Sequence, residues 1–263
     1  MERLDNFLKT KGFFESREKA QKAIKDGVIL VNGNVVKKAS FLCNPADQIT
    51  IQGEVTKYVS RGAYKLEKAL DFFGVDVEGK NAVDIGSSTG GFSDVLLQRN
   101  VGKIVCIDVG KDQLHKKIKE NKKVALYEQT DFRNIAPQII EDAQIIVIDV
   151  SFISTKLLME KLKQTYQNKN VQIISLVKPQ FECGAIIAKK FKGIINNKKV
   201  HYDVLYEVIK KWNEHNFYVN NLTHSPIVGG DGNVEYLLLL SCENTNFKPD
   251  LQNVIEQAFK QLK

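Results

Sequence analysis

From residue 61 onward, short apolar runs alternate with stretches of helical periodicity, and this alternation restricts the fold more than any other feature. The apolar runs have the length of strands and lie at 81–85, 103–107, 123–127, 144–149 and 171–177. Helical patterns flank or separate them, at 61–73, 111–120 and 154–166. Strands that alternate with helices predict an α/β architecture, a mostly parallel sheet covered by helices on both faces.

The C-terminal part departs from strict alternation. After a long helical pattern near 198–215, two apolar runs at 217–223 and 234–241 follow each other with only a loop between them, and 250–263 has the pattern of a final helix. Two successive strands without a crossover helix pair antiparallel. We therefore expect an antiparallel pair at the edge of the sheet, within a domain that spans 61–263.

The first fifty-five residues have a different pattern. Leu4, Phe7 and Leu8 are spaced for a short amphipathic helix, and Ser16 can cap a second one. The dipeptide Asn32-Gly33 lies between two runs rich in β-branched residues, which is a strong signal for a hairpin. The sequence predicts a small α+β domain over 1–55. Residues 52–60 have the composition of a domain boundary, and we assign 56–60 as the linker.

Charge and composition narrow the class of protein. The chain of 263 residues carries 38 Lys and Arg against 31 Asp and Glu, a net charge of +7, which favours a polyanionic partner such as nucleic acid or an anionic membrane surface. The N-terminus lacks the pattern of a signal peptide, and no apolar run reaches eighteen residues, so we expect a soluble cytoplasmic protein. Four widely separated cysteines predict reduced thiols and no metal site.

Residues 82–92 have the pattern of a buried strand, a glycine-rich turn and the start of a helix. The turn is neither the G-x-G-x-x-G of a dinucleotide site nor a P-loop, which disfavours a nicotinamide cofactor and ATP. Gly86, Gly90 and Gly91 would let the backbone approach a ligand closely, and Asp84 is suited to bind an ammonium group. These features favour S-adenosylmethionine.

Two later acidic residues extend this cofactor site. Asp108 ends the next strand, 22 residues after Gly86, where a carboxylate can accept hydrogen bonds from a ribose diol. Asp131 and Phe132 follow the third strand, where they would lie over an adenine. Each aspartate alone is better explained as a loop carboxylate or a helix cap, but the three features on successive strands together favour a methyltransferase.

Four charged residues occur in apolar surroundings. Asp149 and Lys178 each follow a buried strand, Glu235 opens another, and Lys65 begins the helix before the cofactor strand. The carboxyl ends of parallel strands face the ligand crevice, so Asp149 and Lys178 should share one edge of the sheet. For Lys65 alone, a Lys–Asp ion pair that only holds the fold is the better explanation, but four such residues beside a cofactor turn indicate a catalytic site.

Several motifs carry a family resemblance. S-R-G-A-x-K-L at 60–66, D-x-G-x-x-x-G-G-F-S-D at 84–94, D-V-S-F-I-S at 149–154, L-V-K-P-Q-F-E at 176–182 and G-N-V-E-Y-L at 232–237 resemble the FtsJ-like ribose 2′-O-methyltransferases. R-L-D-x-x-L near residue 3, S-R-x-x-A near 16 and the stretch 27–36 resemble the S-four-type RNA-binding domain. Together they resemble the TlyA family, known as hemolysin A and as rRNA cytidine-2′-O-methyltransferases.

The resemblance implies a Rossmann-like methyltransferase that uses S-adenosylmethionine and methylates ribosomal RNA, free or in a ribosomal subunit, with the large subunit favoured and no metal required. It implies a catalytic tetrad of Lys65, Asp149, Lys178 and Glu235, in which Lys178 is the candidate base. It implies cofactor contacts from Asp84, Gly86, Ser87, Gly90, Gly91, Phe92, Asp108, Asp131, Phe132 and Asp149. The basic residues expected to contact RNA are Arg3, Arg17, Lys19, Lys37, Lys38 and Arg61.

Two other functions compete with this interpretation. A membrane-active hemolysin, which the family's older name suggests, would need an apolar span or an amphipathic membrane helix. A catalytically inactive ribosome assembly factor would bind the cofactor without methylating any ribosomal particle. Pseudouridine synthases share the N-terminal domain, but they do not fit the alternating α/β pattern that follows it.

Overall fold

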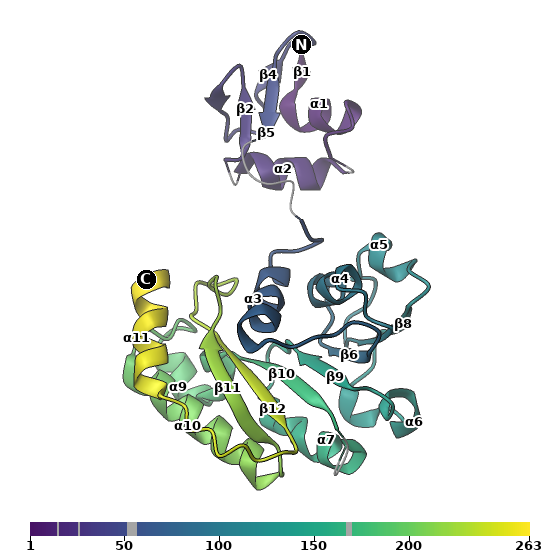
Figure 1. Cartoon of the computed structure of the whole chain (residues 1–263). Helices are drawn as coiled ribbons and strands as arrows, with labels where there is room; N and C mark the ends of the chain where they lie inside the picture. The colour runs from purple at the N-terminus through teal and green to yellow at the C-terminus, as the bar shows by residue number, and fades with distance from the viewer. Residues whose placement is uncertain (15, 26, 52–56, 167–169) are drawn as a thin grey trace. The chain divides into compact units, whose positions relative to one another are not determined.

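The computed structural model describes residues 1–14, 16–25, 27–51, 57–166 and 170–263. The chain forms two compact units, residues 1–57 and 58–263 (Figure 1). Most of the expected boundary region, residues 52–56, lies outside the described residues. Tyr58, which we had placed in the linker, is 3% exposed in the apolar core of the second unit.

The N-terminal unit contains the two expected helices and the expected hairpin. Asn32 and Gly33 have φ angles of 52° and 82°, the left-handed conformation that a tight hairpin turn requires. The sequence did not predict the strand that pairs with β2 on its other side, nor a separate two-stranded pair. The elements are β1 (Glu2–Arg3), α1 (Leu4–Thr10), α2 (Arg17–Lys25), β2 (Ile29–Val31), β3 (Asn34–Val35), β4 (Leu42–Cys43) and β5 (Ile49–Ile51).

The second unit is built on a seven-stranded sheet with the order β11-β12-β10-β9-β6-β7-β8. Its first half contains α3 (Ala63–Phe73), β6 (Asn81–Ile85), α4 (Gly91–Gln98), β7 (Lys103–Ile107), α5 (Lys116–Lys119), β8 (Val124–Tyr127), η1 (Phe132–Asn134), α6 (Pro137–Ile140) and β9 (Ile145–Ile148). Its second half contains η2 (Thr155–Leu157), α7 (Met159–Tyr166), β10 (Gln172–Val177), α8 (Pro179–Glu182), α9 (Ala185–Lys190), α10 (Lys198–Glu214), β11 (Tyr218–His224), β12 (Tyr236–Ser241) and α11 (Leu251–Leu262).

The predicted α/β class and the antiparallel pair at the sheet edge are confirmed. Neighbouring strands from β10 to β8 pair in parallel, whereas β12 runs antiparallel to both β10 and β11. In the β10–β12 register, Val177 lies opposite Tyr236. An antiparallel strand begins where its parallel neighbours end, so the residue before Tyr236, Glu235, reaches the same sheet edge as Lys178.

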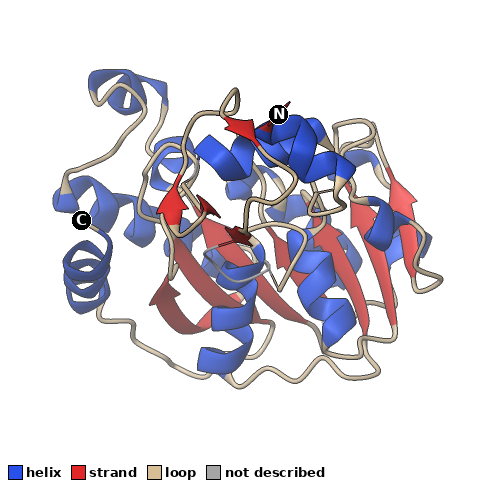
Figure 2. Cartoon of the chain, turned by 90° about the horizontal axis from the view of Figure 1, so that it is seen from above, coloured by secondary structure: helices blue, strands red, loops and turns tan. Residues whose placement is uncertain are grey.

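Apolar side chains fill both faces of the sheet. Along β9, Ile145 and Val147 belong to one core cluster, and Ile146 and Ile148 belong to the other. Such alternation follows from the two-residue period of a strand. One cluster includes residues of α3 and α4, the other residues of α7, α10 and α11, and Figure 2 shows the sheet running between helices.

One helix prediction was wrong in extent. The pattern over 111–120 yields only the four-residue helix α5, and bends precede it. Asp112 has a φ of 53°, in the left-handed region, which interrupts a right-handed helix. The pattern over 154–166 is divided between η2 and α7.

The single tryptophan offers a test of the packing in the second unit. Trp212 is fully buried and its ring meets Phe217 edge to face at a centroid distance of 5.7 Å. We expect Trp212→Ala to lower the free energy of unfolding by about 3–5 kcal/mol, because a large cavity replaces the indole ring. Urea unfolding followed by circular dichroism measures this change. Phe72→Ala, at a side chain that is 56% exposed, is the control and should cost less than about 0.5 kcal/mol; equal effects would contradict the packing described.

Candidate active site

Two lysine–carboxylate pairs lie at the carboxyl edge of the sheet. Lys65, in the first turn of α3, donates from Nζ to Oε2 of Glu235 at 2.6 Å. Both residues are buried, with exposures of 7% and 2%. The structure thus brings together a helix residue and a strand residue that are 170 positions apart.

The second pair joins the ends of two adjacent parallel strands. Lys178 Nζ lies 2.5 Å from Asp149 Oδ1, and it also donates to Ser151 Oγ at 2.8 Å. Asp149 directly follows β9, and Lys178 directly follows β10. Residue 178 is 8% exposed, so its ammonium group has exchanged most of its water contacts for these two partners.

Electrostatics couple the two pairs. Burial raises the pKa of Glu235, while the charge and hydrogen bond of Lys65 act in the opposite direction. Asp149 raises that pKa and Lys178 lowers it, so each pair influences the other. This arrangement can hold an amine in a fixed orientation beside a second fixed charge, as general base catalysis requires.

The glycine-rich turn lies directly beside this cluster. Gly86 has a φ of 83°, and a Cβ atom there would meet the carbonyl oxygen of Asp149 at 2.6 Å. A Cβ on Gly90 would meet Leu114 at 2.8 Å, and one on Gly91 would meet Ser60 Oγ at 2.2 Å. The atoms that a Cβ would meet at these three positions belong to the protein itself, and close approach of a ligand stays a prediction.

Asp84 and Ser87 provide polar atoms that suit a bound ligand. Asp84 is fully buried, and its Oδ2 accepts a 2.6 Å hydrogen bond from Ser93 Oγ. Within the described part of the chain, neither Asp84 Oδ1 nor Ser87 Oγ, both buried, has a hydrogen-bond partner. Buried polar atoms are normally paired, so these two atoms fit the ammonium and carboxylate groups of a methionine moiety.

Burial raises the pKa of Asp84 to about 7, and the charges of Asp149 and Asp108 add to this effect. The hydrogen bond from Ser93 lowers the pKa but does not offset burial. Asp84 therefore changes its charge near neutral pH, where a bound cation would favour the ionised form.

The remaining predicted cofactor residues lie around the turn. Asp108 accepts backbone hydrogen bonds from Ser88 at 2.8 Å and Gly110 at 2.7 Å. Asp131 caps η1 and pairs with Arg133 at 2.5 Å. The rings of Phe92 and Phe132 are 4% and 3% exposed and belong to the two core clusters, so little of their surface is open to a ligand.

The basic residues expected to contact RNA fall into three groups. Arg3 and Arg17 both bind the carboxylate of Asp5 in the N-terminal unit. Lys19, Lys37 and Lys38 are exposed on the same unit. Arg61 belongs to the second unit, where it donates to the carbonyl oxygen of Val228 at 3.1 Å.

Sequence reasoning missed three residues near the lysine–carboxylate cluster. Ser151 binds Lys178, and buried Glu182 accepts hydrogen bonds from Ser154 and Thr155 and so joins the loops that follow β9 and β10. Phe152 is 88% exposed, has a φ of 67°, and lies 5.2 Å from the Phe181 ring, centroid to centroid. All three lie in the motifs at 149–154 and 176–182, which could have pointed to them.

Among the described residues, no group of three or more His, Cys, Asp or Glu side chains could hold a metal ion. No described helix has both the length and the apolar composition that crossing a bilayer requires.

Comparison with known families explains the combination of units. The S4 domain matches residues 2–49, and the FtsJ-like methyltransferase family matches residues 58–242. TlyA of Campylobacter jejuni, named 23S rRNA (cytidine-2′-O)-methyltransferase, is 35% identical over 88% of this chain and 96% of its own. The chain belongs to the TlyA family. Its family implies S-adenosylmethionine as the cofactor.

Other members share the full arrangement. YqxC of Bacillus subtilis, named as a candidate rRNA methyltransferase, is 39% identical over 100% of this chain and 95% of its own. Hemolysin A of Brachyspira hyodysenteriae is 38% identical over 89% of this chain and 98% of its own. A solved structure from Streptococcus thermophilus, named as a candidate hemolysin, has a TM-score of 0.77 and 35% identity, and covers 99% of this chain and 96% of its own.

The contact between Gly86 and Asp149 gives a prediction. Gly86→Ala places a Cβ 2.6 Å from the Asp149 carbonyl oxygen in a left-handed backbone, which costs about 1–3 kcal/mol. We expect a lower thermal midpoint of the second unit and at least about tenfold weaker S-adenosylmethionine binding by calorimetry. Gly230→Ala, with nothing within 4 Å of the new Cβ, should retain wild-type affinity. If both variants bind the cofactor equally well, the turn does not depend on this contact.

Titration of Asp84 gives a second prediction. The pKa of Asp84 is about 7, and a cofactor ammonium bound there would require the carboxylate. If Asp84 binds that ammonium, S-adenosylmethionine affinity should fall as pH drops below 7, by up to about tenfold per pH unit. Ser93→Ala removes a hydrogen bond that lowers the pKa, so the midpoint should move to higher pH. Calorimetry from pH 6 to about 8.5 tests both. Asp84→Asn should remove this part of the pH dependence, and an unchanged profile in that variant would disprove the assignment.

Proposed function

We propose that this protein transfers a methyl group from S-adenosylmethionine to the 2′-hydroxyl of a cytidine in ribosomal RNA, with large-subunit RNA as the favoured substrate. The observation that carries the proposal is the pair of coupled lysine–carboxylate contacts at the carboxyl edge of the sheet, beside the glycine-rich turn. Relatives named for this reaction act on 23S rRNA in Campylobacter jejuni and on 16S and 23S rRNA in Mycobacterium tuberculosis.

Lys178 is the proposed general base. A ribose hydroxyl is a weak nucleophile, so its proton must leave as the oxygen attacks. Lys178 would first release a proton from its ammonium group to solvent, and the neutral Nζ would then accept the proton of the hydroxyl. Asp149, at 2.5 Å, and Ser151, at 2.8 Å, fix the direction of the amine. S-adenosylmethionine supplies an electrophilic methyl group on a sulfonium that is its own leaving group, so the reaction requires no metal ion.

Lys65 and Glu235 have a positioning role in this proposal. Glu235 holds Lys65 at 2.6 Å, and their charges act on the second pair from a fixed distance. Glu235 also has an oxygen close to Gly229, in the loop before β12, which limits its freedom. A rigid set of charges can align hydroxyl and methyl groups, and alignment supplies about 7–11 kcal/mol in favourable cases.

The cofactor would be held along the turn between β6 and α4. Asp84 would bind the ammonium group and Ser87 the carboxylate, beside the backbone of Gly86, Gly90 and Gly91. Asp108 would accept from the ribose, and Asp131 and Phe132 would border the adenine, while Phe92 supports α4 from the core. Asp149, which is both next to Gly86 and paired with Lys178, would border the transferred methyl.

RNA would be bound by basic residues of both units and by one aromatic ring. Arg3, Arg17, Lys19, Lys37, Lys38 and Arg61 would contact phosphates, which supply affinity without reading sequence. The exposed ring of Phe152 follows Ser151 and offers a stacking surface for an unpaired base beside Lys178. An rRNA substrate, free or in a ribosomal subunit, would place the protein in the cytoplasm.

The decisive experiment is methyl transfer to separated ribosomal subunits. We expect tritium from labelled S-adenosylmethionine to appear in large-subunit rRNA as a 2′-O-methylcytidine. Lys178→Ala should lower the rate by at least about 10²-fold, because the base is lost, while calorimetric cofactor affinity stays within about threefold.

A matched lysine controls for the loss of charge. Lys103 is exposed and begins β7, at the opposite edge of the sheet from the active site. Lys103→Ala should keep the wild-type rate. Equal rates for Lys178→Ala and wild type would rule out Lys178 as the base, and no labelling by wild type, despite cofactor binding, would support an inactive assembly factor.

A further inference from the structure

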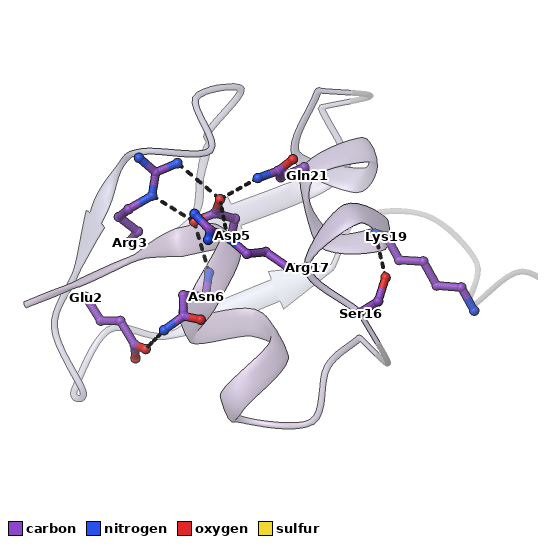
Figure 3. A network of polar contacts seen from close by, with 8 residues as sticks. All are labelled: Glu2, Arg3, Asp5, Asn6, Ser16, Arg17, Lys19 and Gln21. Atoms are coloured by element: carbon purple, nitrogen blue, oxygen red, sulfur yellow. Dashed lines mark hydrogen bonds and ion pairs between the residues drawn. The ribbon is translucent and has the colours of Figure 1, made fainter.

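Asp5 is a fully buried carboxylate in the N-terminal unit that the proposed reaction does not use. Its Oδ1 accepts from Arg3 Nε at 3.1 Å and from the backbone N–H of Asn6 at 3.0 Å. Its Oδ2 accepts from Arg3 Nη2 at 3.1 Å, Arg17 Nε at 2.9 Å and Gln21 Nε2 at 2.7 Å (Figure 3). One carboxylate thus joins the start of α1 to two arginines and the first turns of α2.

The shared oxygen brings two positive groups close together. Arg3 Nη2 and Arg17 Nε bind the same Asp5 oxygen at 3.1 and 2.9 Å, so they lie no more than about 6 Å apart. Two guanidinium groups at this separation repel each other unless a negative charge lies between them. Asp5 provides that charge, and its pKa is held well below the usual range, first by the hydrogen bond from Arg3.

Both arginines remain available to solvent. Their side chains are 47% and 45% exposed, whereas the Asp5 side chain is 0% exposed. Two guanidinium groups of this unit are therefore exposed to solvent, whereas the carboxylate that holds them is buried. Planar guanidinium groups suit phosphate better than a lysine does, because their N–H donors form a fixed fork.

We propose that Asp5 is a positioning residue that holds Arg3 and Arg17 together as a preformed site for a backbone phosphate of RNA. The inference rests on the proposed function, which makes RNA the partner of this unit. A flexible arginine loses rotamer freedom when it binds, and fixing it beforehand removes that cost, which corresponds to an affinity factor of about two to ten per side chain.

The proposal predicts an effect with the opposite sign to simple electrostatics. Asp5→Asn raises the net charge of the protein by one, so charge alone would strengthen RNA binding and steepen its salt dependence. If Asp5 positions the arginines, the same substitution frees them and weakens binding. It also lowers the slope of log affinity against log salt by about one, because a phosphate contact is lost.

The experiment measures binding of the full chain to purified large-subunit rRNA by filter binding at several salt concentrations. We expect Asp5→Asn to weaken binding about fivefold or more and to lower the salt slope. Asp47→Asn makes the same charge change in the same unit, at a carboxylate bound by Asn32 and by the Asn44 backbone, with no arginine bonded to it among the described residues. It should leave affinity unchanged or slightly stronger.

A double-mutant cycle separates positioning from support of the fold. In an Arg17→Ala background, Asp5→Asn should have a smaller effect on binding than in wild type, because only one of the two arginines that Asp5 holds is still present. A purely structural role would weaken binding by the same factor in both backgrounds and would overturn the proposal.

Circular dichroism shows whether Asp5→Asn folds. If it does not fold, a milder variant still tests the proposal. Gln21→Leu removes one hydrogen bond to Asp5 and alters no charge, and it should lower affinity and slope in the same direction, by about twofold. If Gln21→Leu, or a folded Asp5→Asn, binds rRNA as tightly as wild type, the positioning role of Asp5 is disproved, whereas the proposed function is not. Absence of rRNA binding by the wild type would instead disprove the proposed function.

Discussion

Removing charged side chains from water is unfavourable, and the carboxyl edge of this sheet buries Lys65, Lys178 and Glu235 almost completely and Asp149 in large part. Each lysine there is compensated by one carboxylate, Lys65 by Glu235 and Lys178 by Asp149. The charges can pair only if the ends of β9 and β10 and the starts of β12 and α3 lie close together. The antiparallel direction of β12 meets this requirement, because it starts where β9 and β10 finish. Loss of one partner would leave a buried unpaired charge, so the site and the fold stabilise each other.

The sequence predicted the strands of the second unit closely, because their apolar runs are short, continuous and separated by helical patterns. Residues 81–85 and 103–107 coincide with β6 and β7. The helix over 111–120 failed for a local reason, the left-handed backbone at Asp112, which apolar periodicity does not report. The strand β5 was missed because it pairs across a long loop, and three-residue strands have little pattern of their own.

The membership of the site was predictable, and so was the common sheet edge of Asp149 and Lys178. Apolar surroundings marked Asp149, Lys178 and Glu235, whereas the pairing of Lys65 with Glu235 depends on the antiparallel strand order. Arg3 and Arg17 were chosen for their charge, and their shared partner Asp5 was passed over because a lone acidic residue in a basic domain carries no pattern. Side-chain partners distant in sequence are set by the tertiary fold, so composition and spacing cannot identify them.

The contact between Gly86 and the main chain of Asp149 has a consequence for how ligands communicate. The turn that we propose to hold the cofactor lies against the main chain of Asp149, which we propose to border the transferred methyl, and Asp149 N–H bonds to the carbonyl of Ile85 at 3.0 Å. A shift of the turn would therefore move Asp149, the partner of Lys178. Thermodynamic linkage then makes the effect reciprocal: whatever factor the cofactor applies to RNA affinity, RNA applies to cofactor affinity. If the spent cofactor strengthens the binding of methylated RNA, methylated RNA must strengthen the binding of the spent cofactor by the same factor.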